Sequence, residues 1–170
     1  MREFKTEMAD FKNEMADFKT ETRKSLAGLS KSLGTLAEDI LGPSIPTLFR
    51  RFFPEGNAPD FAMRTRRHDK NSGDEKEFDT PAWNDKVFLV SETKARLRPE
   101  DLDSFERTIA EVRNFFPVET AGKKVCAAMA SLYIDPSLVR GGEKRGFIMI
   151  ALGNNLAEVM NSEGFKPAAF

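Results

Sequence analysis

The fold of this chain is decided by residues 77–94, which read EFDTPAWNDKVFLVSETK. Two strand-like runs, residues 77–83 and 86–94, flank a short turn at Asn84-Asp85. A tight turn between two such runs is typical of a β-hairpin. We therefore predict that the two runs pair in antiparallel fashion.

Three charged side chains lie on this predicted hairpin. Asp79 is on the first strand, and Glu92 and Lys94 end the second. Side chains two positions apart on a strand point to the same face, so Glu92 and Lys94 share a face and Thr93 points away. Antiparallel pairing can bring Asp79 beside them. Two carboxylates next to an ammonium group can form an Mg²⁺ site, because hard cations prefer oxygen ligands. The alternative is an acid beside a turn and an ordinary surface ion pair.

The flanking sequence alternates between helical and strand-like segments. Near-continuous apolar runs in the later strands suit a sheet that is covered on both faces. The predicted elements, in order, are a short helix at 45–53 capped by Ser44, a strand at 61–67, the hairpin, a helix opened by residues 99–101, a strand at 125–134, a helix from its cap Asp135 to about residue 144, a strand at 147–152, and a last strand or turn at 156–160.

The N-terminus repeats itself every seven residues. Residues 4–10 return as 11–17 and begin again at 18–21, which is the period of a coiled coil. The seam and its flanking charges are Phe4, Phe11 and Phe18 at d, Met8, Met15 and Thr22 at a, Lys5, Lys12 and Lys19 at e, and Glu7, Glu14 and Glu21 at g. In a parallel dimer, Glu at g would face Lys at e of the partner. Phe is uncommon at d of two-stranded cores, so the number of strands stays open.

The apolar seam continues to Ile40 after a four-residue stutter between Thr22 and Leu26. Gly42-Pro43 then ends the helix. We predict a coiled-coil helix at residues 1–41, merging at its end into the first helix of a domain at 42–170, with self-association through residues 4–40. Residues 25–35, which contain two glycines, form a softer stretch in this interpretation.

The order of Asp79, a hairpin and then Glu92-Thr93-Lys94 at the end of an apolar strand resembles the PD-(D/E)XK nuclease superfamily. The phrases VSETKARL (residues 90–97) and ASLYI (residues 130–134) look like an uncharacterised prokaryotic group within it, whose members carry a heptad-rich helix ahead of a nuclease-like domain. The resemblance covers roughly residue 36 to the C-terminus. It implies an α/β fold of the restriction-endonuclease-like type, with a mixed sheet flanked by helices.

The resemblance also implies a chemistry. In the family, the Asp, the Glu and the following backbone carbonyl hold Mg²⁺, which here means Asp79, Glu92 and the carbonyl of Thr93, with Mn²⁺ as a substitute. Lys94 positions the attacking water or accepts its proton; burial would lower the pKa of Lys94, and the two carboxylates would raise it. Many members add an acid from the first helix, for which Glu38 is the candidate; an ordinary solvated residue is the alternative. The implied function is Mg²⁺-dependent phosphodiester hydrolysis of DNA.

The chain departs from the family pattern in two places. Phe78 replaces the leading Pro of the signature, and the chain has no glutamine, so the Gln-x-x-x-Tyr motif of RecB-type nucleases is absent. Four basic residues are candidates for contacts with DNA phosphates, since Arg and Lys make most backbone contacts, or are ordinary surface charges. They are Arg96, Arg98, Lys123 and Lys124.

Composition narrows the remaining functions. The net charge of −1 gives no overall basic field for nucleic acid. One histidine, His68, and one cysteine, Cys126, argue against a zinc site, a disulfide within the chain and a Ser-His-Asp triad. Cys126 lies in an apolar run and is predicted to be a buried hydrophobe.

No membrane-spanning run and no signal-peptide pattern is present, so we expect a soluble, cytoplasmic protein. The second hypothesis is a non-catalytic coiled-coil interaction protein on a nuclease-like scaffold.

Overall fold

The computed structural model describes residues 2–154 and 156–170, and for Arg2, Glu3, Lys5 and Leu156 it describes the backbone alone. The prediction that Lys5 occupies an e position, and the part of the predicted helix at Met1, lie outside these residues. The chain divides into two compact units, Met1–Thr35 and Leu36–Phe170.

The described part of the first unit, residues 2–35, is a single helix. It belongs to helix α1 (Arg2–Leu41), whose last six residues lie in the second unit. The predicted long helix is confirmed, and it ends just before Gly42-Pro43 as expected. The stretch at 25–35 is helical throughout, so its two glycines do not interrupt the helix. None of the helices within the described residues combines the length and the apolar character that crossing a bilayer requires.

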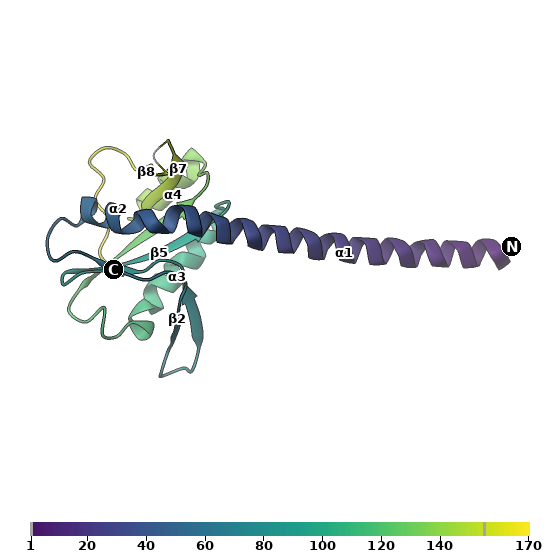
Figure 1. The fold of residues 1–170 in the computed structure, drawn as a ribbon, viewed down its shortest axis with the longest axis horizontal. Helices are drawn as coiled ribbons and strands as arrows, with labels where there is room; N and C mark the ends of the chain where they lie inside the picture. The colour runs from purple at the N-terminus through teal and green to yellow at the C-terminus, as the bar shows by residue number, and fades with distance from the viewer. Residues whose placement is uncertain (1, 155) are drawn as a thin grey trace. The chain divides into compact units, whose positions relative to one another are not determined.

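The second unit is built on a six-stranded mixed sheet (Figure 1). The spatial order is β1-β4-β5-β6-β7-β8; the inner pairs β5·β6 and β6·β7 are parallel, and the other three are antiparallel. The strands are β1 (Asp60–Phe61), β4 (Ala82–Trp83), β5 (Val87–Lys94), β6 (Lys124–Ser131), β7 (Ile148–Gly153) and β8 (Leu156–Val159). Residues 156–160, predicted as a strand or a turn, thus supply a strand.

Helices cover both faces of this sheet. Helix α3 (Pro99–Phe115) and helix α4 (Pro136–Lys144) pack on one face, against alternate residues of β5 such as Phe88 and Val90. The end of α1 and helix α2 (Ile45–Phe52), joined by a 3-10 turn η1 (Gly42–Ser44), pack on the other face against Leu89. The predicted fold class, an α/β mixed sheet flanked by helices and preceded by a long helix, is confirmed.

Two predicted strands are each divided in the structure. Residues 61–67 give β1 and then β2 (Thr65–His68), because Arg64 adopts a positive φ of 49° that turns the chain. The predicted strand at 77–83 is interrupted: its start belongs to β3 (Glu75–Phe78) and its end to β4. Pro81, which lies between them, has no N–H to continue a ladder. Strands β2 and β3 pair with each other in a separate two-stranded sheet, visible beside α3 in Figure 1.

The two predicted helix caps have different outcomes. Asp135 caps α4 by accepting a hydrogen bond from the Ser137 N–H at 2.8 Å, as predicted. The prediction for Ser44 is wrong, since its side chain makes no capping hydrogen bond to α2. The chain enters α2 directly from η1, so Ser44 has helical backbone angles and not the extended conformation that N-cap residues adopt.

Candidate active site

The end of β5 and the segment after β3 meet at one place on the sheet. Glu92, Thr93 and Lys94 are the last residues of β5, and Asp79 directly follows β3. The Thr93 N–H donates a hydrogen bond of 2.7 Å to Oδ2 of Asp79, which fixes this carboxylate beside the strand end. The Arg64 N–H donates to the Asp79 carbonyl at 2.7 Å, which fixes its backbone.

Glu92 and Lys94 point to the same face of β5. Nζ of Lys94 lies 2.5 Å from Oε1 of Glu92, and both side chains are partly exposed. Thr93 lies between them on the opposite face and is buried. The two-residue spacing therefore places one carboxylate and one ammonium group in direct contact, as the strand period requires.

The Asp79 carboxyl is strongly perturbed. Burial raises its pKa from the ordinary 3.8 to about 7, against the hydrogen bond from Thr93, and the charges of Glu38 and Glu92 raise it further while Lys94 lowers it. Ionised Asp79 therefore lies in a partly desolvated position near two other acids. Such a carboxylate is stabilised by an added cation.

Lys94 stays charged. Burial lowers the pKa of Lys94, but the hydrogen bond to Glu92 and the charges of Glu92, Asp79 and Asp101 outweigh it, so its pKa is raised. The balance that the sequence left open is thus decided in favour of the carboxylates. An ammonium group with a raised pKa donates hydrogen bonds at neutral pH and does not take up a proton.

A cavity of about 250 Å³ opens beside these side chains. Asp79, Glu92 and Lys94 line it together with Lys76 and Glu77 of β3. Helix α3 contributes Ser104, Phe105 and Thr108 on the other side. The cavity is small and most of its lining residues are polar or charged, which suits a polar ligand better than an apolar one.

Glu38 is held near the site by a residue that sequence reasoning missed. Nε of Arg64 lies 2.8 Å from Oε2 of Glu38, and its NH2 group lies 2.6 Å from Oδ1 of Asp39. Arg64 thus joins the end of α1 to the backbone of Asp79. No signal in the sequence marks Arg64, because its role depends on a positive φ and on contacts with residues more than 20 positions away.

The oxygen atoms at this strand end are of the chemical types that bind hard divalent cations. Asp79 and Glu92 offer carboxylate oxygens, and Thr93 offers a backbone carbonyl, which are the ligand types that Mg²⁺ takes. Among the described residues, no group of three or more His, Cys, Asp or Glu side chains is arranged to hold a metal.

The four basic candidates for DNA contacts lie at two opposite ends of the sheet. Arg96 and Arg98 directly follow β5 and are exposed, so they lie at the same end as Lys94. Lys124 pairs with Val87 at the start of β5, whereas Ser131 pairs with Lys94. Seven residues of strand separate these ends, or about 23 Å. Lys123 and Lys124 are thus not brought together with the catalytic candidates.

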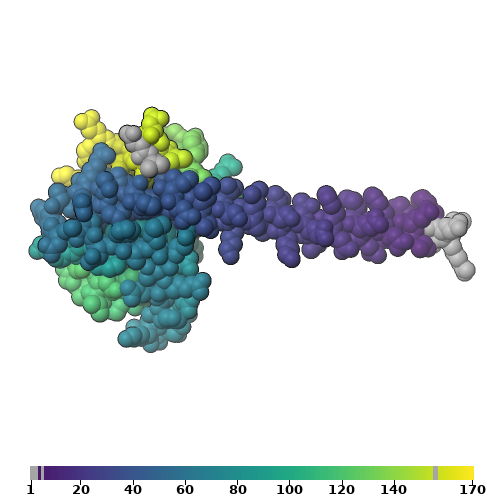
Figure 2. Space-filling model, viewed as in Figure 1, coloured from purple at the N-terminus to yellow at the C-terminus, as the bar shows by residue number. Residues whose placement is uncertain are grey.

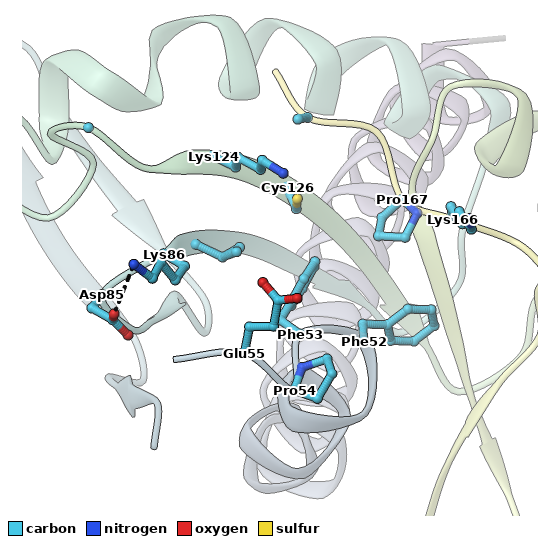
Figure 3. Close-up of a pocket in the computed structure, with 13 residues that line it drawn as sticks. Phe52, Phe53, Pro54, Glu55, Asp85, Lys86, Lys124, Cys126, Lys166 and Pro167 are labelled. Atoms are coloured by element: carbon cyan, nitrogen blue, oxygen red, sulfur yellow. Dashed lines mark ion pairs between the residues drawn. The ribbon is translucent and has the colours of Figure 1, made fainter. Parts of the chain in front are cut away.

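A larger cavity of about 640 Å³ lies at that far end (Figure 3). Phe52, Lys86, Lys124 and Cys126 line it, and Lys86 lies 3.6 Å from Asp85. Cys126 is buried as predicted, and burial raises the pKa of its thiol to about 11. The thiol therefore stays protonated, which argues against a nucleophilic role for this cysteine.

No family model matches this chain, and no curated protein matches it. Among solved structures it is similar to a repair endonuclease from Pyrococcus abyssi, with 17% sequence identity and a TM-score of 0.41. The match covers 65% of this chain and 46% of that one, so the chain spans less than half of that structure's length.

Proposed function

We propose that this chain is a metal-dependent phosphodiesterase of the PD-(D/E)XK type that hydrolyses DNA, with Mg²⁺ as its ion and Mn²⁺ as a substitute. The observation that carries the proposal is the meeting of Asp79, Glu92 and Lys94 at one polar cavity, with Asp79 fixed by the Thr93 N–H. A passive surface gives no reason to place an aspartate in a partly buried position near two other acids.

In this proposal, some residues bind the metal ion and others orient the water and the phosphate. Asp79, Glu92 and the Thr93 carbonyl would hold the ion, with the Asp79 carboxylate oriented by the hydrogen bond from the Thr93 N–H. A bound ion lowers the pKa of a coordinated water and offsets charge on the phosphate. Glu38, held by Arg64, acts on the ion through its charge and not as a direct ligand in this proposal.

Lys94 orients the reactants. Its ammonium group lies against Glu92 and keeps its proton at neutral pH, so it donates hydrogen bonds to the attacking water or to a phosphate oxygen. Fixed donors aimed at developing negative charge lower the barrier in many phosphoryl-transfer sites. Arg96 and Arg98, at the same end of β5, contact neighbouring phosphates of the substrate.

The test is a cleavage assay on supercoiled, linear, branched and single-stranded DNA with and without Mg²⁺. Wild type should cleave at least one of them in Mg²⁺ and none in a chelator, and Asp79→Ala and Glu92→Ala should lose the activity. Asp85→Ala is the matched control, because Asp85 lies at the other end of the same hairpin. If Mg²⁺ and Mn²⁺ at millimolar concentration neither bind nor support cleavage, the proposal is wrong.

The second candidate is a non-catalytic interaction protein on the same scaffold. Two observations favour it, namely the net charge of −1 and the lack of a three-side-chain metal group among the described residues. For either function we propose self-association through the heptad seam of residues 4–40. The cleavage assay separates the two candidates, because the second predicts no DNA product under any metal condition.

A further inference from the structure

The N-terminal helix carries an uncovered apolar seam. Figure 2 shows the side chains of residues 6–35 standing out along one helix. The seam residues are 42 to 66% exposed, and they are Phe4, Met8, Phe11, Met15, Phe18, Leu26, Leu29, Leu33 and Leu36. Beyond them Ala37 and Leu41 are fully buried within the second unit, so the unpartnered seam ends at Leu36.

Four of the charges beside the seam have no opposite charge three or four positions away on their own helix, namely Glu7, Lys12, Glu14 and Lys19. Side chains three or four positions apart are neighbours on a helix. At those distances from Glu7, Lys12, Glu14 and Lys19 the sequence offers apolar residues, Thr, or charges of the same sign. In a coiled coil, the opposite charge for each of them would come from the facing helix.

A second copy in parallel orientation supplies these opposite charges. In a parallel coiled coil, a g residue faces the e residue five positions later on the partner, so Glu7 meets Lys12 and Glu14 meets Lys19, once in each direction. In an antiparallel pair g faces g and e faces e, which would set Glu against Glu and Lys against Lys. We propose that residues 4–36 associate with a second copy of this chain in parallel and in register.

The stutter fixes the register. The seam shifts by four residues between Thr22 and Leu26. Two copies that are aligned residue for residue meet this shift at the same height, whereas a copy displaced by one heptad would set a shifted seam against an unshifted one. The second unit begins at Leu36, after the helix. In a parallel pair, the second units of both copies therefore follow the same end of the coiled coil.

A charge-swapped chain tests the orientation. The full-length variant Glu7→Lys, Lys12→Glu, Glu14→Lys, Lys19→Glu has the same composition and net charge as wild type, and it keeps every parallel pairing with itself. It should associate with itself as tightly as wild type does, yet form no mixed species with wild type in native mass spectrometry after isotopic labelling of one chain. Preferential formation of mixed species would establish an antiparallel pair and overturn the proposal.

Three further variants measure the strength and the register. Lys12→Glu with Lys19→Glu should raise the dissociation constant about tenfold or more, because each of these pairs becomes repulsive. Met8→Cys and Met15→Cys should each form a disulfide-linked pair on mild oxidation, with wild type, which has only buried Cys126, as the control. In an antiparallel pair, a residue faces the same residue of the partner only at the centre of the overlap, so at most one of the two cysteine variants could crosslink. Crosslinking of only one variant therefore contradicts the proposal. So does a wild type that sediments as a monomer at high micromolar concentration.

Discussion

At the scale of single residues, the ionisation of Asp79 links the site to the stability of the fold. The folded pKa of about 7 lies above the ordinary 3.8 because of burial. Between these values the folded state keeps a proton that the unfolded state has lost. This contribution to stability is full below about pH 4 and is lost as the pH rises to about 7, by at most about 4 kcal/mol.

We therefore predict that, in a chelator, Asp79→Asn is more stable than wild type at pH 7 and close to wild type at pH 4. Asparagine can still accept the hydrogen bond from Thr93 and carries no charge to desolvate. Urea unfolding across this pH range measures the difference between the two chains. That comparison also removes the opposite trend from Asp69, Asp85 and Asp135, whose pKa values hydrogen bonds lower. Parallel curves would show that Asp79 is not buried as described.

Lys94 should matter for turnover and not for folding or metal binding. Its Nζ carries a charge beside Glu92, whereas all proposed metal ligands are oxygens. In single-turnover experiments with Mg²⁺, the cleavage rates of Lys94→Ala and Lys94→Met should be lower than that of wild type by a factor of about one hundred or more. Lys86→Met, before the start of the same strand, should cleave like wild type. Equal rates for all four chains would mean that any activity arises elsewhere.

Thr93 offers a test that leaves its backbone in place. Oγ1 of Thr93 is buried and makes no hydrogen bond to a described residue. A buried polar atom without a partner costs about 1–3 kcal/mol. Thr93→Val should therefore stabilise the fold by about 1 kcal/mol in thermal or urea unfolding without changing metal affinity. Destabilisation would indicate that the hydroxyl has a partner, such as an ordered water.

At the scale of elements, the apolar pattern predicted most helices and strands. It failed to predict the chain turn that depends on the backbone conformation of a single residue. The hairpin of β4 and β5 follows from two strand-like runs around a turn, and helix α3 from apolar residues at a 3.6-residue period. Helix α4 follows from its cap Asp135, and the buried strands β6 and β7 follow from near-continuous apolar runs. The division at Arg64 does not, because an arginine with positive φ has no sequence signature. Strands β2 and β3 overlap predicted strands, but their pairing with each other, which joins Arg66 to Glu77, has no local signature.

The same distinction applies to the candidate site. The placement of Glu92 beside Lys94 follows from the strand period, and Asp79 reaches them because β4 and β5 pair in antiparallel fashion. The attachment of Glu38 to Arg64 and the position of Lys76 on the cavity depend on how separate elements pack. Such tertiary contacts leave no local pattern for sequence reasoning to find.

Helix α1 should be separable into a part that associates and a part that folds with the domain. Deleting residues 1–24 removes the e and g charges and most of the aromatic seam, while Leu36–Phe170 keeps its own core. We expect the truncated chain to be monomeric and to unfold cooperatively near the temperature of the full chain's domain. Light scattering and circular dichroism measure both properties. A truncated chain that still associates would place the interface on the second unit.

At the scale of the whole molecule, parallel association would compensate for the weak attraction of DNA. A net charge of −1 gives little non-specific binding, so a single copy would leave the duplex quickly. Two copies joined by one coiled coil turn the second encounter into an event within one complex, at an effective concentration that can reach about millimolar. Efficient cutting of both DNA strands would therefore require the proposed catalytic site together with the proposed parallel association.

This reasoning predicts different products from the full-length and truncated chains. Full-length protein should convert supercoiled plasmid to linear DNA with little nicked intermediate, because the second cut follows while the complex is still bound. The chain without residues 1–24 should accumulate nicked circles first, at a similar initial rate per site. The time course on an agarose gel distinguishes these outcomes. If neither chain cleaves, the proposed catalytic function fails and parallel association still stands on its own tests. If both accumulate nicks alike, the two sites act independently, and association serves some purpose other than cutting both strands.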